Sequence, residues 1–498
     1  MQKRVITLGV VTASSLLMLN FAMASSIEED TPKRVTKGNM SIKYNVLPKE
    51  VDSASKLFSE GVFYGRLRSN SFYWDWENET WNDESKKGLL DNKNMGMGGS
   101  VIYKTAILNG FSATMSYYGS FNPSFFRMDK DEVAGAKAGK DTFSRYNVKN
   151  DSEYGIYAFG ENYLKYQNSM FNVILGRQFF ESVFTASNDT KMIPNTFDGV
   201  SLSAKIAKKT KVRFAFFDKQ KLRDHDEAHD VITFKDSNGD SWGNNDDAAI
   251  HKGLTYQKFV DAGEDVEHDL ILADFQTKYI DNLKLNFSFL QVPDIVKDIV
   301  LEANYKIPFD NGWAISSGIR YFYQMDDGGG AIAGYTSLNG KEAVGYDADV
   351  QTSLDSSLIA LRTDLIMPNK KGFFRLGYSK VEDKADIVAP WRGFPTGGYT
   401  RAMAQYNWYA NTETVMIRGV YKFNPDFKAS LRYAIQDFDN DKLNISPDGT
   451  IWHLDTWYDI SPQLQLKTRL GIYNADTKNS AKFDNSYNEY RLELNYLF

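Results

Sequence analysis

The sequence contains no cysteine, so disulfide bonds contribute nothing to the stability of the folded chain. Beyond the N-terminal region it has no long apolar run, and its mean hydropathy is −0.45, which leaves no segment suited to cross a membrane as a helix. Histidine is rare, with 5 residues in 498, and no G-x-S-x-G, H-E-x-x-H or P-loop signature occurs. We therefore expect neither an enzyme nor a bound cofactor.

The chain also lacks an excess of basic residues. Its formal net charge is −6 at pH 7 and its pI is about 5.6. Proteins that bind phosphate backbones need a basic surface, so we expect no nucleic-acid partner. Aromatic residues, in contrast, are abundant at 14%, with 29 tyrosines, and they recur at the ends of alternating segments. Such positions are typical of the aromatic girdles of membrane barrels.

The N-terminus has the pattern of an export signal. Lys3 and Arg4 precede an apolar stretch at 5–21, and the sequence Ala-Met-Ala follows at 22–24. This arrangement predicts a cleaved signal peptide at 1–24 and places the mature protein outside the cytoplasm. The alternative is a membrane-anchoring helix, but the apolar stretch is short and polar residues interrupt it.

The C-terminal segment alternates between apolar and polar residues and finishes on an aromatic side chain. One face carries Tyr490, Leu492, Leu494, Tyr496 and Phe498. A period of two residues predicts a β-strand rather than a helix. A terminal aromatic residue on such a strand resembles the sorting signal of bacterial outer-membrane proteins, so we expect the barrel-assembly machinery to recognise it.

The same alternation recurs from residue 57 to 498, for example in VSLSAKI at 200–206 and KVRFAFF at 211–217. Since only a closed barrel can cross a bilayer with strands, we predict an all-β transmembrane antiparallel barrel of about eighteen strands. Residues 25–56 are polar, lack clear alternation and are expected to form a periplasmic lead-in. Short connectors alternate with long ones, as expected for periplasmic turns and extracellular loops.

The long connectors are expected outside the cell, with shorter ones after Leu290, Asp437 and Asn474. In barrels of this size, loops must narrow the lumen, and we expect the third long loop to fold inward. Its residues Glu181, Asp189 and Lys191 could then face wall arginines across the pore. The predicted long loops are 69–93, 119–151, 179–197, 219–268, 325–351 and 381–411. Residues 402–409 belong either to the last of these loops or to an extension of the following strand.

Arginines occupy the polar face of most predicted strands. A guanidinium facing lipid near the bilayer centre costs about 2 to 4 kcal/mol, so these side chains should face the lumen. There they could simply hydrate the wall, or they could hold carboxylates weakly in succession. Asp274, Glu302, Asp364, Asp455 and Glu493 share this face and should neutralise some of them. The predicted pore-lining arginines are Arg66, Arg68, Arg213, Arg320, Arg362, Arg375, Arg418, Arg432, Arg469 and Arg491.

One segment carries a family resemblance. Residues 193–199 read Ile-Pro-Asn-Thr-Phe-Asp-Gly, and an early segment from Phe63 reads FYGRLRSNSFYWDW. Together with the chain length, these features resemble the OprD family of outer-membrane porins. The resemblance implies an eighteen-stranded channel for small charged nutrients, often bearing carboxylates, with a basic ladder on the wall and inward-folded loops.

Two loop segments could suggest metal sites. Asp236, Asn238, Asp240 and Asp247 partly match a calcium-binding loop, but glycine stands at the fourth place instead of the sixth and the last ligand is not glutamate. A flexible acidic loop is the alternative. His225 and His229 could bind a metal, yet no further ligand is fixed in sequence, and the surrounding charges indicate a solvated loop.

The pattern as a whole predicts an outer-membrane porin for small anionic or zwitterionic solutes. The main alternative is a structural or adhesive barrel with a plugged lumen. An energy-coupled receptor is a third class, but it needs a separate plug domain, for which the N-terminal lead-in is too short. The expected surroundings are outer-membrane lipid and lipopolysaccharide, and the protein could be a monomer or a loose homotrimer.

Overall fold

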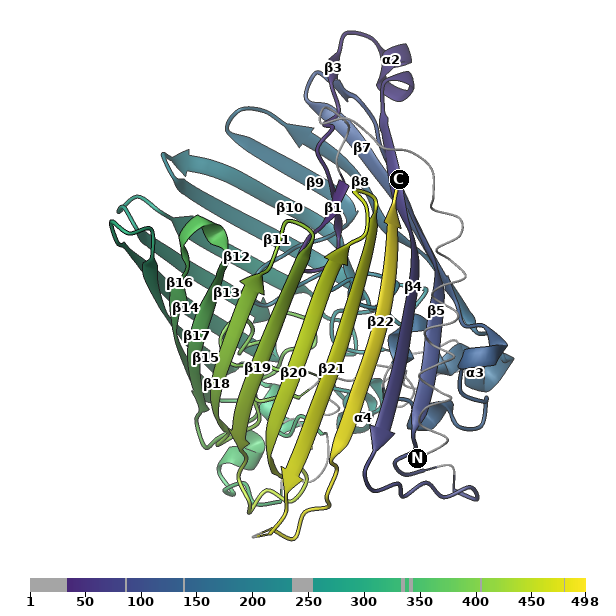
Figure 1. Cartoon of the computed structure of the whole chain (residues 1–498), viewed down its shortest axis with the longest axis vertical. Coiled ribbons are helices and arrows are strands. Elements are labelled where there is room, and N and C mark those ends of the chain that lie inside the picture. Colours follow the sequence, from purple (N-terminus) through teal and green to yellow (C-terminus); the bar gives the residue numbers. More distant parts are fainter. Residues whose placement is uncertain are drawn as a thin grey trace.

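The computed structural model describes residues 34–498, except 86, 138, 235–253, 333–335, 340–343, 404 and 479. These residues form a closed antiparallel barrel of eighteen wall strands, in which the last strand pairs with the first (Figure 1). The predicted fold class and strand number are therefore confirmed. The predicted signal peptide and calcium loop lie outside the described residues.

The wall strands follow one another in sequence order around the barrel. They are β4 (Val62–Trp76), β5 (Asn92–Lys104), β7 (Phe111–Phe121), β8 (Gly155–Gln167), β9 (Phe171–Gln178), β10 (Thr196–Ala207), β11 (Thr210–Lys221), β12 (Leu270–Thr277), β13 (Leu283–Val292), β14 (Val296–Pro308), β15 (Ala314–Asp326), β16 (Ser356–Ile366), β17 (Gly372–Val381), β18 (Glu413–Lys422), β19 (Phe427–Asp437), β20 (Asp448–Asp459), β21 (Leu464–Asp476) and β22 (Tyr487–Leu497).

In the residues that the structure describes, the helices are short and lie outside the wall strands. They are α2 (Ala54–Ser59), α3 (Arg145–Asp151) and α4 (Tyr256–Ala262), with 3-10 turns η1 (Ser124–Phe126), η2 (Val133–Gly135), η3 (Lys140–Thr142), η5 (Gly329–Ala331), η6 (Val350–Thr352) and η7 (Pro368–Lys370). None of the helices in the described part of the chain is long and apolar enough to span a membrane.

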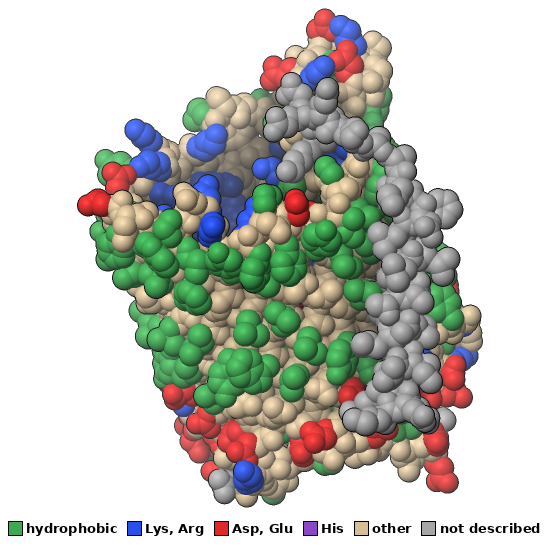
Figure 2. All heavy atoms as spheres, in the orientation of Figure 1, with side chains coloured by type: hydrophobic (Ala, Val, Ile, Leu, Met, Phe, Trp, Pro, Cys, Tyr) green, Lys and Arg blue, Asp and Glu red, His purple; other side chains and the backbone are tan. Residues whose placement is uncertain are grey.

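Alternation along each strand decides which side chains face outward. On β17, Leu376 on the outer face is 57% exposed, whereas its neighbour Arg375 on the inner face is 8% exposed. Apolar side chains accordingly gather in bands on the outer face of the barrel that Figure 2 shows. Because charge on that face is costly in lipid, the arginines face inward.

The connectors differ in length at the two ends. Short turns join strands at the end where the C-terminus lies, which we call the turn end, and long connectors lie at the opposite loop end (Figure 1). The predicted alternation of connectors is thus observed. The first long loop is shorter than the expected 69–93, because β4 continues to Trp76. On this extension the ring of Trp74 stacks on Tyr487 of β22, with 3.9 Å between centroids, so aromatic packing prolongs the strand.

Much of the lumen near the loop end is filled by an apolar core. Inward residues of β13 to β16, such as Val300, Phe322 and Leu358, pack with residues of the inward connectors, such as Phe184 and Trp391. The inner face of the wall is therefore partly apolar, whereas the alternation in the sequence suggested that it is polar throughout. Burial of these side chains is the force that holds the connectors inside the barrel.

The N-terminal segment also enters the barrel. Strands β1 (Arg34–Thr36) and β2 (Ile42–Tyr44) form a hairpin, and its tip residue Met40 is 3% exposed. The backbone oxygen of Met40 accepts a hydrogen bond from Arg66 on β4 at 2.9 Å. The first wall strand begins at Val62, later than the expected start at 57, because a short parallel pair of β3 (Glu50–Val51) with β6 (Ile107–Leu108) and helix α2 precede it.

Candidate functional site

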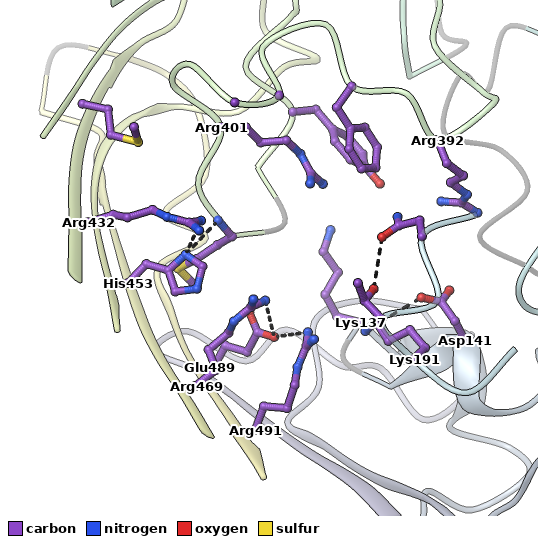
Figure 3. Close-up of a pocket in the computed structure, with 18 of the residues that line it drawn as sticks. Lys137, Asp141, Lys191, Arg392, Arg401, Arg432, His453, Arg469, Glu489 and Arg491 are labelled. Carbon is purple, nitrogen blue, oxygen red and sulfur yellow. Dashed lines mark hydrogen bonds and ion pairs between the residues drawn. The ribbon is translucent and has the colours of Figure 1, made fainter. Parts of the chain in front are cut away.

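A cavity of about 310 Å³ lies between the wall strands and several connectors, chiefly residues 179–195 and 382–412, which fold into the lumen (Figure 3). The connector between β7 and β8 and the connector between β11 and β12 also contribute lining residues. Basic side chains dominate the lining of the cavity. It is lined by Trp74, Lys137, Lys140, Asp141, Asn188, Thr190, Lys191, Arg223, Arg375, Arg392, Phe394, Gly397, Gly398, Tyr399, Arg401, Met403, Tyr406, Met416, Arg418, Arg432, His453, Arg469, Glu489 and Arg491.

The wall side of this cavity carries a row of arginines on adjacent strands, which we call the arginine row. Arg375 lies directly opposite Arg418, and Arg418 lies directly opposite Arg432. The row continues through His453 on β20 to Arg469 and Arg491, which again lie opposite each other. The row consists of Arg375, Arg418, Arg432, Arg469 and Arg491. Half of the predicted pore arginines are therefore brought together in one place.

Carboxylates on the same strands hold most of this row. Asp364 accepts hydrogen bonds from Nε and Nη2 of Arg375, at 2.6 and 2.7 Å, so the ion pair is bidentate. Asp455 contacts Arg469 at 2.9 Å and Arg432 at 3.8 Å. These contacts fix the guanidinium orientations, because paired donors cannot rotate without losing hydrogen bonds.

At the ends of the row the pairing differs. Glu489 contacts Arg491 at 2.7 Å and Arg469 at 3.9 Å, so one carboxylate serves two arginines. Arg418 donates from Nε to the hydroxyl of Ser430 at 3.0 Å, and no carboxylate of the described residues forms an ion pair with it. The row thus retains positive charge toward the cavity.

The connectors add basic groups from the other sides. Arg223 contacts Asp141 at 2.8 Å, and Lys191 contacts the same carboxylate at 3.8 Å. Burial, together with the nearby charge of Arg491, lowers the pKa of Lys191 to about 7. Lys191 also lies over the ring of Phe72, 4.2 Å from its centroid, where a cation is stabilised.

Arg401 enters the cavity from the connector 382–412. Its guanidinium lies 3.5 Å from the ring centroid of Phe394 and 5.8 Å from that of Trp408. Burial lowers the pKa of Arg401 to about 9, a shift that Tyr406 opposes. Arg401 belongs to the lining residues that sequence reasoning missed, together with Arg223, Arg392, Lys137 and Lys140. Connectors have no strand periodicity, so no pattern marks which of their side chains point inward.

The other predicted pore arginines lie inside the barrel but do not line the cavity. Arg66 and Arg68 contact Asp189 at 2.5 and 2.9 Å, and Arg68 also contacts Glu493. Arg213 forms an ion pair with Asp274. Two others, Arg320 and Arg362, hold the connector 382–412, because each donates a hydrogen bond to the backbone of this connector. Arg320 also contacts Glu302 at 2.6 Å, and Arg362 also donates to Asn304.

Of the three residues expected to constrict the pore, only Lys191 lines the cavity. Asp189 is buried between arginines of β4 and so presents no free negative charge to the lumen. Glu181 accepts hydrogen bonds from Ser187 and, at 2.7 Å, from Asn39 of the N-terminal hairpin. These two carboxylates thus join the connector 179–195 to β4 and to the N-terminal hairpin.

The interpretation of His225 and His229 as part of a solvated loop is wrong. His225 is 0% exposed, its ring lies 5.0 Å from that of His229, and both rings contact Phe234. Burial lowers the pKa of His225 to about 4, so the imidazole is neutral at pH 7. In the described portion, no cluster of three or more His, Cys, Asp or Glu side chains could hold a metal ion.

A buried carboxylate fastens the inward connectors to one another. Asp386 accepts hydrogen bonds from the backbone N–H of Leu338 at 2.6 Å, from that of Ala410 at 2.7 Å and from the hydroxyl of Tyr346 at 2.7 Å. These donors come from two different connectors, between β15 and β16 and between β17 and β18. The connector 382–412, which contributes to the lining of the cavity, is therefore tied to a second connector.

Comparison with known proteins identifies the family. The profile of the outer membrane porins of the OprD family matches residues 134–498. No curated protein matches the sequence significantly. Among solved structures, OccAB1 of Acinetobacter baumannii superposes with a TM-score of 0.65 at 14% identity, covering 90% of this chain and 98% of that one.

Two structures from Pseudomonas aeruginosa are similar in the same way. OpdQ has a TM-score of 0.59 at 14% identity, over 89% of this chain and 99% of its own. OpdK, solved with vanillate, has a TM-score of 0.60 at 12% identity, over 88% of this chain and 98% of its own. At such low identity these likenesses support the fold, while the profile match covers most of the sequence. The chain belongs to the OprD family of outer-membrane porins.

Proposed function

We propose that this porin is a passive diffusion channel that prefers small anionic solutes, especially those that carry carboxylate groups. The observation that carries the proposal is the arginine row at the cavity. Like charges directly opposite one another on adjacent strands are destabilising, so wall stability does not explain them. Arg375, Arg418 and Arg432 face one another in this way on three adjacent strands.

The charge balance of the cavity supports the same proposal. Eleven of its lining residues are Lys or Arg, and two are Asp or Glu. Such an excess of one sign between low-dielectric walls attracts anions and repels cations. Figure 2 shows further Lys and Arg side chains inside the opening at the turn end. A solute carboxylate would therefore meet several guanidinium groups in succession, each binding weakly enough to release it.

The solved structure of OpdK with vanillate, a carboxylate, is consistent with this solute class. Planar guanidinium groups match carboxylates through two parallel hydrogen bonds, which chloride cannot form. Zwitterions that expose a carboxylate belong to the same class.

The test is permeation of matched solutes. In proteoliposomes at pH 7.5, swelling rates are compared for propionate and for propionamide, which has nearly the same size but no charge. The proposal predicts faster entry of propionate. Equal rates, or faster entry of the amide, would contradict it.

A structural or adhesive barrel is the second candidate, and the apolar core in the lumen is the observation that favours it. That candidate predicts no swelling with either solute, although the barrel is folded and inserted. The two functions are therefore separated by the same experiment.

Several further assignments belong to the proposal. Residues 1–24 would direct export, and 25–56 would form a periplasmic lead-in whose hairpin of β1 and β2 reaches into the barrel. The final strand β22 and the Phe498 that follows it would be the segment that the assembly machinery recognises. The ring of Phe498 lies 6.2 Å from that of Phe63, measured between centroids. Lipopolysaccharide would surround the loop end of a monomer or loose trimer.

A further inference from the structure

Arg401 lies on a different side of the cavity from the arginine row. In Figure 3 it points into the cavity from the connector 382–412, whereas Arg469 and Arg491 point in from the opposite side, on β21 and β22. Arg432 enters from a third direction, on β19. A solute in the cavity therefore has guanidinium groups on facing walls, and the two walls belong to independent structural elements.

The charge of Arg401 is supported by aromatic rings instead of a carboxylate. Its guanidinium stacks on Phe394, and Phe394 in turn stacks on Trp408 with 5.5 Å between ring centroids. No ion pair to Arg401 is found among the described residues, and its buried Nε has no hydrogen-bond partner there. Stacking occupies the faces of a guanidinium and leaves its edge N–H groups free to donate.

Arg418 is the matching residue on the wall. Its neighbours Arg375 and Arg432 both contact carboxylates, but Arg418 has only the Ser430 hydroxyl as a hydrogen-bond partner in the described structure. Arg418 makes one such bond through Nε, so its terminal nitrogens retain their donors. The cavity thus contains two guanidinium groups, one on an inward connector and one on a wall strand, that form no ion pair with an acidic residue in the described part of the chain.

We propose that Arg401 and Arg418 form the two halves of one binding site for a solute with two carboxylate groups, and that each guanidinium holds one carboxylate. This inference rests on the proposed function and names its solute class more narrowly. A monocarboxylate can satisfy only one of the two cations. A dicarboxylate can satisfy both. A cavity of about 310 Å³ is at the small end of ligand pockets, which suits a short diacid.

The experiment compares succinate with monomethyl succinate, which has the same chain but one carboxylate masked. Single channels are recorded in planar bilayers at pH 7.5, and the concentration of each solute that half-blocks the chloride current is measured. Because succinate can make a second charged hydrogen-bonding contact, its half-blocking concentration should be at least about tenfold lower than that of monomethyl succinate.

The variants Arg401→Gln, Arg418→Gln and the double variant assign this preference to residues. Either single substitution should remove most of the preference for succinate over its monoester, because that preference requires both guanidinium groups. The double variant should therefore remove little more than either single variant. Lys384→Gln is the matched control, because Lys384 lies on the same connector, pairs with Glu382 at 3.0 Å and does not line the cavity. It should leave the preference unchanged.

Arg401→Lys covers the case in which Arg401→Gln does not fold. It keeps the charge but loses the planar donor pair, so the succinate preference should fall while conductance persists. Equal block by the two solutes, or a preference that survives both single substitutions, would overturn the inference. The proposed function would still stand if both solutes block better than neutral dimethyl succinate. A channel that none of them blocks would overturn both.

Discussion

Asp189 and Arg68 form an ion pair inside the barrel, with 2.9 Å between Oδ1 and Nη1 and side chains that are 1% and 0% exposed. The second oxygen of Asp189 contacts Arg66. Since the two arginines belong to the wall strand β4, this carboxylate fastens the connector 179–195 to the wall. The connector narrows the lumen because it is held at this point.

Replacing Asp189 by Asn should therefore loosen that connector. Removing one partner of a buried ion pair costs about 3 to 5 kcal/mol, because the remaining charge is left without compensation. We expect a lower urea midpoint and larger fluctuations of the single-channel current. Lys56→Gln, which breaks an exposed pair with Asp52, is the control and should change neither. A quiet current with an unchanged midpoint in Asp189→Asn would contradict this role.

The N-terminal hairpin should limit the conductance. Asn39 contacts Glu181 and Ser187 of the connector 179–195, and Lys467 of β21 contacts the sulfur of Met40 at 3.7 Å. Deleting residues 34–45 removes this material from the lumen and should raise the single-channel conductance. Phe58→Ser in α2, where the side chain is 65% exposed, is the control. Equal conductance with and without the hairpin would show that it does not narrow the pore.

Substitutions of Arg320 and Arg418 should have different effects, because Arg320 has a structural role and Arg418 a functional one. Arg320 contacts Glu302 and donates to the backbone oxygens of Pro395 and Gly397, so Arg320→Gln should speed proteolysis of the connector 382–412. Arg418 makes no such contact, and Arg418→Gln should leave proteolysis unchanged while it lowers anion preference. Limited proteolysis and reversal potentials measure the two effects. The reverse pattern would contradict the assignment of roles.

The packing of the inward connectors should depend on pH through Asp386. Burial raises its pKa from 3.8 to about 6, although hydrogen bonds from Ala410, Leu338 and Tyr346 oppose the shift. The folded state therefore binds this proton more readily than the unfolded state. The contribution of the protonated Asp386 side chain to stability is fully present below pH 3.8 and is lost as the pH rises through about 6.

Hydrogen exchange tests this dependence, with rates corrected for the intrinsic effect of pH. Protection of the Leu338 and Ala410 amides should decrease between about pH 4 and pH 7 in the wild type. In Asp386→Asn, which cannot ionise, that decrease should be absent. The same slope in both proteins would assign the effect to another group.

The barrel could be predicted from the sequence because its physics is local. A strand that faces lipid on one side and water on the other must alternate, and the cost of charge in lipid fixes which face carries arginine. That argument directs Arg375, Arg418 and Arg432 inward, and in the structure these three side chains line the cavity. The strand number could be predicted as well, because short and long connectors alternate along the chain.

The site could be predicted only in part, since its contacts are distant in sequence. Asp189 meets Arg66 across 123 residues, and no periodicity signals this pairing. Arg401 stands in a connector without alternation, and its aromatic support becomes visible only in three dimensions. The apolar core inside the barrel was missed for a related reason, because inward apolar residues such as Phe322 have the same parity as inward arginines.

The reversal potential under a KCl gradient tests the central claim most directly, because it reports the sign of the charge that controls permeation. The wild-type channel in planar bilayers should show a potential of the sign that chloride preference produces. Arg418→Gln should reduce its magnitude, and Lys384→Gln should not. A potential near zero, or one of the sign that potassium preference produces, would contradict an anion-preferring pore.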